Sequence, residues 1–170
     1  MRGSRVRSWT TALLLAGAFL APTVAGADST PGTGAWLGLG IGGGHFSDVG
    51  GVAGHVDAGW AFGETFLSAR LAGVADTVVC VFCQSKGDRV DTALLLGRQW
   101  GWGSGLRSIA IGAGYVRGQH FAGSSVGLAL EARLMARLGR GLGVGLYGVA
   151  NVNSKSSFFG VTLAVRFGGI

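Results

Sequence analysis

The chain has 170 residues, of which 34 are glycine, 48% are hydrophobic and only 13% are charged. That charged share is about half of what a soluble globular domain carries, so a water-exposed surface is difficult to build from this composition. Only two prolines are present and glycine has no strict three-residue period, which excludes collagen and argues against a disordered low-complexity chain. The length suits a single domain.

The first 27 residues have the pattern of a cleaved secretory signal. A basic start is followed by a short apolar core over residues 9–20 and by small residues that end at Ala27. The core is shorter than the roughly 20 residues that a membrane-spanning helix needs, which argues against a retained anchor. We therefore expect a signal peptide over residues 1–27 and one mature domain over residues 28–170. The basic residues of the signal are Arg2, Arg5 and Arg7.

Removal of the signal leaves 11 basic against 8 acidic side chains, a net charge of +3. The mature chain has no run of Lys and Arg and no alternation of basic with aromatic residues that could follow a phosphate backbone. Nucleic acid is therefore not expected among its partners.

Alternation with a period of two residues predicts eight β-strands in the mature chain. The last segment is the clearest, because apolar residues from Phe159 to Phe167 alternate with smaller or polar residues such as Gly160 and Thr162. In the fourth segment, Leu95 and Arg98 interrupt the pattern, and a β-bulge is expected there. The segments are residues 36–41, 55–62, 67–72, 90–97, 108–115, 126–139, 142–151 and 159–167.

Short connections alternate with longer, more polar ones along the chain. Such alternation is typical of an up-and-down barrel with short turns at one end and long loops at the other, and an even number of strands places both chain ends on the turn side. The short connections are residues 62–65, 101–105 and 139–141, and the long ones are residues 43–51, 76–88, 118–125 and 151–157.

The two faces of these strands predict a barrel in a membrane. One face is continuously apolar, whereas the other is mostly Gly, Ala and Ser with a few charges and would form a poor aqueous surface. With the apolar face in lipid, every backbone group is paired and the charges lie in the lumen. A secreted β-sandwich or solenoid is the alternative. The charges expected in the lumen are Asp57, Arg70, Asp91, Glu131, Arg133, Arg137 and Arg166, next to His55. Aromatic girdles are expected from Trp60, Phe62, Trp100, Trp102, Phe159 and Phe167.

With these features the mature chain resembles the small eight-stranded outer-membrane β-barrel superfamily, the OmpA-like and Ail-like proteins. The most specific local element is the last strand, where Gly160, Leu163 and Val165 look like the assembly signal of such proteins. Two departures are Phe159 before the glycine and a Gly168-Gly169-Ile170 end after Phe167. The resemblance implies an all-β transmembrane barrel in the bacterial outer membrane, recognised by the barrel assembly machinery.

An eight-stranded barrel is just wide enough to be filled by its own side chains, so the lumen charges are expected to form a packed ion-pair network rather than a solute pore. Passage of protons or small ions stays open as an alternative. His55 and Asp57 share a strand face at about 7 Å, which is too far for a hydrogen-bonded catalytic pair. No cofactor is expected.

Two classes of function follow for such a barrel. The first is non-enzymatic and acts through external loops in envelope structure or surface interaction, with lipopolysaccharide phosphates meeting basic residues of the outer rim. The second is a lipid A-modifying enzyme resembling the outer-membrane deacylases, for which His120 with Ser124 or Ser125 is the candidate pair. Their spacing does not match the deacylase motif. The basic rim residues are Lys86, Arg89, Arg117 and Lys155.

Cys80 and Cys83 are the only cysteines, spaced C-x-x-C in the longest expected loop. Because the export signal implies an oxidising compartment, a local disulfide is the first expectation. A redox motif would need a thioredoxin-like setting that the sequence lacks. A metal site would need two more ligands, such as His45, His120 or an acidic residue of another loop.

Replacing both Cys80 and Cys83 by Ser should leave barrel assembly intact, because a disulfide that closes so short a loop removes little entropy from the unfolded chain. The loop should become more sensitive to added protease, which limited proteolysis followed by gel analysis measures. Complete labelling of both cysteines by a thiol reagent in the untreated protein would instead indicate free thiols or a metal site.

Overall fold

The computed structural model describes residues 33–46, 49–76, 89–118, 124–155 and 157–169. The expected signal peptide, both cysteines and His120 lie outside these ranges. Among the residues described, no helix has the length and apolar character needed to span a membrane.

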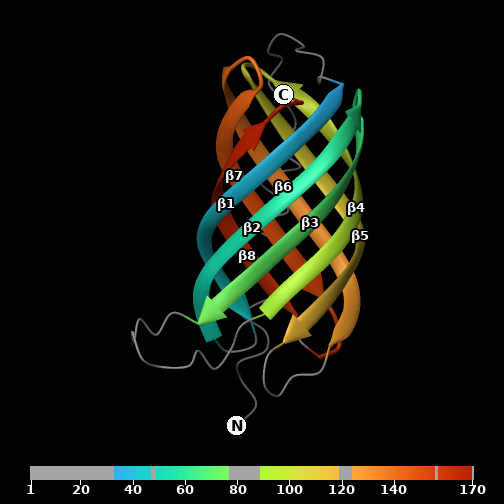
Figure 1. The fold of residues 1–170 in the computed structure, drawn as a ribbon, viewed down its shortest axis with the longest axis vertical. Coiled ribbons are helices and arrows are strands. Elements are labelled where there is room, and N and C mark those ends of the chain that lie inside the picture. Colours follow the sequence, from blue (N-terminus) through green and yellow to red (C-terminus); the bar gives the residue numbers. More distant parts are fainter. Residues whose placement is uncertain (1–32, 47–48, 77–88, 119–123, 156, 170) are drawn as a thin grey trace.

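Eight antiparallel strands form one closed barrel in which each strand pairs with its neighbours in sequence and β8 pairs with β1 (Figure 1). This confirms the fold expected from the sequence. The strands have 10 to 15 residues and extend beyond most of the segments expected from alternation alone. They are β1 (Gly34–Phe46), β2 (Val49–Phe62), β3 (Thr65–Asp76), β4 (Arg89–Trp102), β5 (Gly105–Gly118), β6 (Ser125–Gly139), β7 (Leu142–Val152) and β8 (Phe158–Phe167).

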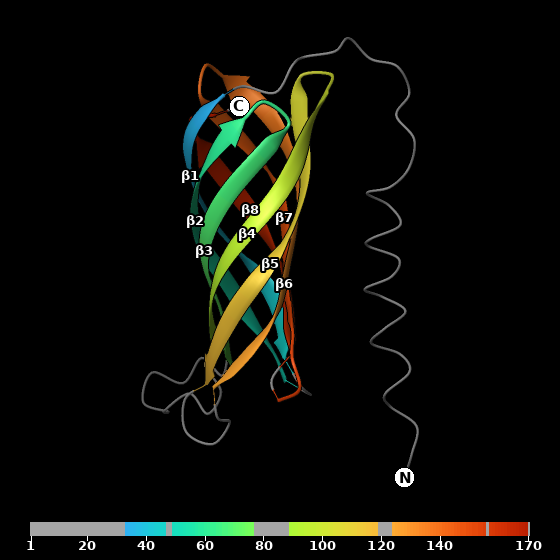
Figure 2. The same cartoon turned by 90° about the vertical axis from the view of Figure 1, so that its right-hand side faces the viewer.

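Three two-residue turns join the hairpins at the end of the barrel where β1 begins and β8 finishes (Figures 1 and 2). We call this the turn end, and the opposite end the loop end. Each turn has a glycine with positive φ, the conformation that a tight hairpin favours: 68° at Gly63, 53° at Gly103 and 76° at Gly141. The C-terminal segment also lies here, because the amide of Gly168 donates to the carbonyl of Gly141 at 2.7 Å.

Alternation assigns the two faces of every strand as the sequence predicts. The outward row is apolar and exposed, as in Ile41 of β1 and Leu163 of β8, which are 68% and 60% exposed. The inward row holds small, aromatic and polar side chains, most of them buried. The phase of β4, which is the least regular in sequence, follows the same rule: Leu95 is buried inside and Arg98 points outward and is exposed.

Two local expectations are wrong. Residues 43–51 do not form a long loop, because the β1–β2 ladder continues through Gly44 and Gly51 to the pair Phe46 and Val49. Their glycines resemble a loop composition, but a Cβ at Gly44 would lie 2.7 Å from Val74, so the strand needs a glycine there. The bulge expected in β4 is also absent, because its pairings with β3 and β5 keep one register throughout, and the register shift occurs between Arg137 and Gly139 of β6.

Some inward glycines allow neighbouring strands to approach closely. An added Cβ at Gly145 of β7 would lie 1.9 Å from the carbonyl oxygen of Leu134 on β6, and one at Gly112 of β5 would lie 1.9 Å from that of Leu94 on β4. Real Cβ atoms do not approach a backbone oxygen so closely, so the strand coiling at these points depends on glycine.

Gly145→Ala should therefore destabilise the folded barrel by roughly 1–3 kcal/mol, the usual range for a side chain inserted where there is no room. The matched control is Gly148→Ala on the same strand, where the nearest atom to an added Cβ is 3.8 Å away. The control should stay within about 1 kcal/mol of the parent. Urea unfolding in detergent micelles measures both variants, and equal midpoints would contradict the packing argument.

Candidate functional site

The lumen contains a group of five charged side chains from four strands that we call the charged belt: Asp57 of β2, Arg70 of β3, Asp91 of β4, and Glu131 and Arg133 of β6. All five are at most 4% exposed. Buried charges are costly unless they are paired and hydrogen-bonded, so their partners decide whether this arrangement is stable.

Each carboxylate of the belt contacts one arginine. Arg133 lies 2.9 Å from Asp57 and 2.6 Å from Glu131, and Arg70 lies 2.5 Å from Asp91. Arg70 also approaches Glu131 at 3.9 Å. The two arginines therefore join three acidic side chains into one connected network.

Each carboxylate also accepts a hydrogen bond from a neutral group. The Trp36 indole donates to Asp57 at 2.7 Å, the Asn151 amide donates to Asp91 at 2.8 Å, and the Tyr147 hydroxyl donates to Glu131 at 2.5 Å. These neutral donors supplement the two guanidinium groups without adding charge. Three carboxylates can thus be buried with only two directly paired arginines.

Arg70 spans the lumen. Its guanidinium donates from β3 to the carbonyl oxygen of Leu130 on β6 at 2.9 Å, and it reaches that of Ala150 on β7 at 3.5 Å. Because β3 and β7 stand on opposite sides of an eight-stranded barrel, one side chain bridges the interior.

Arg133 is surrounded by aromatic rings. Its guanidinium carbon lies 5.2 Å from the ring centre of Trp36, 5.5 Å from that of Phe66 and 4.8 Å from that of Tyr147. Cation–π attraction is strongest where water is excluded, and at 2% exposure Arg133 is in that situation. The rings thus replace part of the hydration that this arginine loses on burial.

His55 lies at the edge of the belt. Its Nδ1 is 3.0 Å from the hydroxyl oxygen of Thr162, and its ring stacks on Tyr147 with centres 3.9 Å apart. Its Nε2 is 3.5 Å from Asp57, closer than the strand spacing suggests because the two side chains converge, yet too long for a good hydrogen bond. His55 therefore packs against the belt through Tyr147 and Thr162 without a hydrogen bond to Asp57.

Arg137 and Arg166 lie outside the ion pairs of the belt. Arg166 donates to the carbonyl oxygen of Gly169 at 2.6 Å and stacks over Trp36 at 4.1 Å. Arg137 is half-buried near the turn end and has no ion pair with any described residue. Within the described lumen, the network is thus smaller than the set of seven charges expected from the sequence.

Glycines on the inward faces make room for these large side chains. A Cβ at Gly38 would lie 2.2 Å from the Asp57 carboxylate, and one at Gly114 would lie 2.6 Å from the Asp91 carboxylate. Gly127 is similarly close to Asn151, at 2.2 Å. The glycines of the inward rows therefore leave the space that the side chains of the belt and their partners fill.

Buried apolar side chains lie on the inward faces near both ends of the barrel. Those near the loop end come from strand positions next to the loops, and those near the turn end from positions next to the turns. The loop-end group is Phe46, Val74, Val116 and Phe158, and the turn-end group is Trp36, Ala61 and Phe66; all are at most 4% exposed. Buried charges share these levels, since Asp91 is the register partner of Val116 and Arg166 lies near the finish of β8.

The alternation places the belt partners Trp36, Tyr147, Asn151 and Thr162 on inward faces, but it does not identify them as functional. The one sequence feature that could have identified these partners is a large or polar residue on an inward row that otherwise consists mostly of Gly and Ala. Of the remaining candidates, Ser124 is exposed and Ser125 is half-buried where β6 begins, and their expected partner His120 lies outside the described residues. In the described ranges, no group of three or more His, Cys, Asp or Glu could hold a metal ion. The enzyme alternative stays an untested prediction.

The basic residues expected at the outer rim lie at the loop end where they are described. Arg117 and Lys155 are exposed, whereas Arg89 is half-buried with its guanidinium 5.2 Å from the ring centre of Phe46. Lys86 lies outside the described residues.

Glu131→Ala should destabilise the barrel by roughly 3–5 kcal/mol, because it leaves the Arg133 guanidinium and the Tyr147 hydroxyl without their shared acceptor in a dry interior. The matched control is Glu64→Ala, which breaks the exposed ion pair with Arg98 at the turn end and should change stability by about 0–1 kcal/mol. Unfolding midpoints in detergent measure both, and a parent-like midpoint for Glu131→Ala would contradict the belt.

Comparisons with known proteins identify the fold and nothing finer. No family model and no curated protein matches the chain. Neisserial surface protein A is similar over 83% of this chain and 99% of its own, with a TM-score of 0.55 and 10% identity. A designed transmembrane β-barrel covers 83% of this chain and 98% of its own, with a TM-score of 0.50 and 14% identity. Ail of Yersinia pestis, in complex with the heparin analogue sucrose octasulfate, covers 80% and 99%, with a TM-score of 0.49 and 14% identity. The chain has the fold of the small eight-stranded outer-membrane β-barrels.

Proposed function

We propose that this protein is a non-enzymatic barrel of the bacterial outer membrane with a sealed lumen, which acts through its loop end in envelope structure or surface interaction. In this proposal residues 1–27 are removed on export, and the turn end faces the periplasm. Outer-membrane lipid, lipopolysaccharide and the barrel assembly machinery are its partners.

The outer wall supports the membrane placement. Large apolar side chains on the outward rows are well exposed, as in Leu94 at 65% and Val126 at 71%, and they recur on all eight strands. Such a continuous apolar band is unfavourable in water and favourable in lipid. Aromatic residues lie near the strand ends on the same wall, including Trp60, Phe62 and Phe167 at the turn end.

The crossing of Arg70 from β3 to β6 and β7 is the observation that carries the sealed lumen. A conducting pore needs a continuous path of water, and here the path meets a paired guanidinium that reaches across the lumen and buried apolar side chains near both ends. With the interior occupied in this way, the loop end is the surface left for recognition. Neisserial surface protein A, which shares the fold, is by its name a surface protein.

The proposal predicts that the exported protein sediments with the outer membrane and migrates differently in unheated and heated detergent gels, since a closed barrel has no free edge. Refolded into phospholipid vesicles, it should not allow swelling in an isotonic solution of a monosaccharide. Arg70→Ala should raise ion flux above the parent, because it removes the side chain that spans the lumen.

The matched control is Arg98→Ala, which removes an arginine from the outer wall and should leave the vesicles tight. Recovery as a soluble periplasmic monomer would contradict the membrane placement. Sugar-driven swelling by the parent protein would contradict the sealed lumen while leaving the placement intact.

A further inference from the structure

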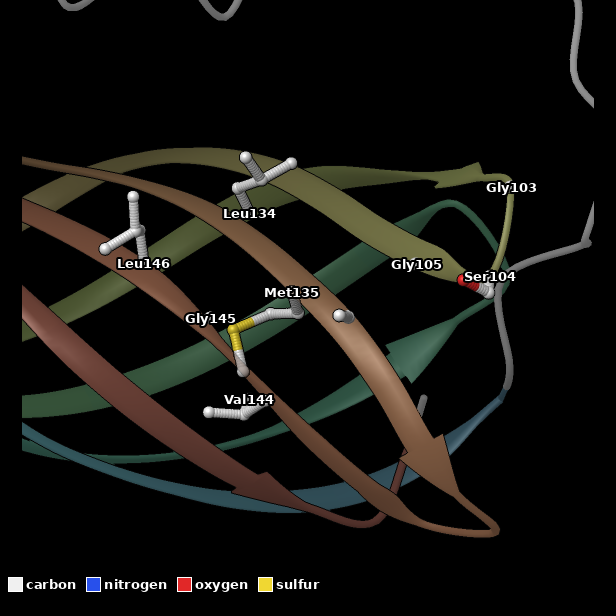
Figure 3. Close-up of a pocket in the computed structure, with 9 residues that line it drawn as sticks. Gly103, Ser104, Gly105, Leu134, Met135, Val144, Gly145 and Leu146 are labelled. Atoms are coloured by element: carbon white, nitrogen blue, oxygen red, sulfur yellow. The ribbon is translucent and has the colours of Figure 1, made fainter.

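The outer wall is hollowed near the turn end, between the β4–β5 turn and the β6–β7 hairpin (Figure 3). The groove has a volume of about 430 Å³. Gly105 and Gly145 contribute no side chains to its floor, while Leu134 and Leu146 project from the wall beside it (Figure 3). The lining is apolar, so in a membrane this groove suits a hydrocarbon chain.

Arg107 stands at the edge of this groove. It follows Gly105 by two residues on β5, and it is the register partner of Leu134 on β6, so its side chain lies on the same outer face. It is half-buried, its Nε has no hydrogen-bond partner within the described part of the chain, and no ion pair joins it to a described acid. A guanidinium in this position is available for an anion from outside the protein.

The turn end as a whole carries excess positive charge. Its described charged side chains outside the lumen are one acid, Glu64, and three arginines. Glu64 pairs with Arg98, which leaves the other two without an acidic partner among the described residues. The arginines are Arg98, Arg107 and Arg140.

Aromatic residues mark this level of the wall as a membrane interface. Trp100 of β4 is the register partner of Arg107, and Trp60 and Phe62 lie next to the β2–β3 turn with 50% and 64% exposure. Aromatic girdles in membrane barrels lie at the depth of lipid headgroups. Arg107 therefore lies beside the groove at the level where lipid headgroups meet the wall.

We propose that this groove is a binding site for an anionic phospholipid of the leaflet at the turn end. One acyl chain occupies the hollow between Leu134 and Leu146, and the headgroup phosphate pairs with Arg107 at its edge. An arginine fork matches the geometry of a phosphate and forms charge-assisted hydrogen bonds with it. A zwitterionic lipid adds an ammonium that the unpaired Arg107 and Arg140 disfavour. The site rests on the membrane placement proposed above.

The test uses the full mature barrel refolded into vesicles of phosphatidylethanolamine and phosphatidylglycerol in a 3:1 ratio with identical acyl chains, followed by native mass spectrometry of the lipid retained per barrel. The parent should retain phosphatidylglycerol at about five times its share of the mixture or more. Arg107→Gln should abolish most of this enrichment, and Arg107→Lys should restore part of it. The matched control is Arg117→Gln, which removes the same charge from the outer face of the same strand at the loop end and should change retention by less than twofold.

A second variant tests the groove without changing charge. Ala136→Phe places a ring on the exposed outer face of β6 at the groove and should reduce phosphatidylglycerol retention several-fold with every arginine intact. Equal retention of both lipids by the parent, equal losses in Arg107→Gln and Arg117→Gln, or an unchanged Ala136→Phe would each overturn the site. If the parent is heat-modifiable in the same vesicles, the membrane placement holds and these outcomes concern the lipid site alone. If Arg107→Gln does not fold, the lipid retention of Ala136→Phe tests the site instead.

Discussion

The interior of this barrel depends on the guanidinium of Arg133. It contacts the carboxylates of Asp57 and Glu131 at 2.9 and 2.6 Å, and three aromatic rings surround it. Without this cation, two carboxylates from opposite parts of the sheet would face one another in a dry space, where like charges repel strongly. The positions of Trp36 and Tyr147 also follow from it, because each contacts Arg133 with its ring and a carboxylate with its polar group.

The inward glycines leave the volume that the buried arginines occupy. An eight-stranded barrel has little internal volume, so an arginine that spans the lumen fits only where the facing strands have glycine on their inward rows. Gly38, Gly114 and Gly127 supply that space beside the belt, while Gly112 and Gly145 allow the strands themselves to approach. The inward glycines of the strands thus have a lumen role and a wall role, which are separate from the turn role of Gly63, Gly103 and Gly141.

The sequence allowed the strands, their faces and the closed topology to be predicted, because a period of two residues is directly visible in β6 and β8. It did not allow the extension of the β1–β2 hairpin through residues 43–51 to be predicted, since glycines at Gly43 and Gly44 look the same whether they form a loop or make room for a neighbour. The residues that hydrogen-bond to the belt could not be predicted from the sequence for a different reason. Which inward residues meet across a lumen depends on the stagger of the barrel, and this stagger is set by all eight registers together rather than by any single strand.

The interactions of the belt join residues that are far apart in sequence. Arg70 and Leu130 are 60 residues apart, as are Asp91 and Asn151, and His55 and Thr162 are 107 apart. Contacts of such long range form late, because the loop that they close is costly until the rest of the structure is in place. A sheet of fewer than eight strands would therefore present unpaired arginines and carboxylates on one face, and lipid would penalise each of them heavily. The polar lumen thus couples insertion to closure: the outer wall can enter the membrane at low free-energy cost only as β1 meets β8 and the inward charges find one another.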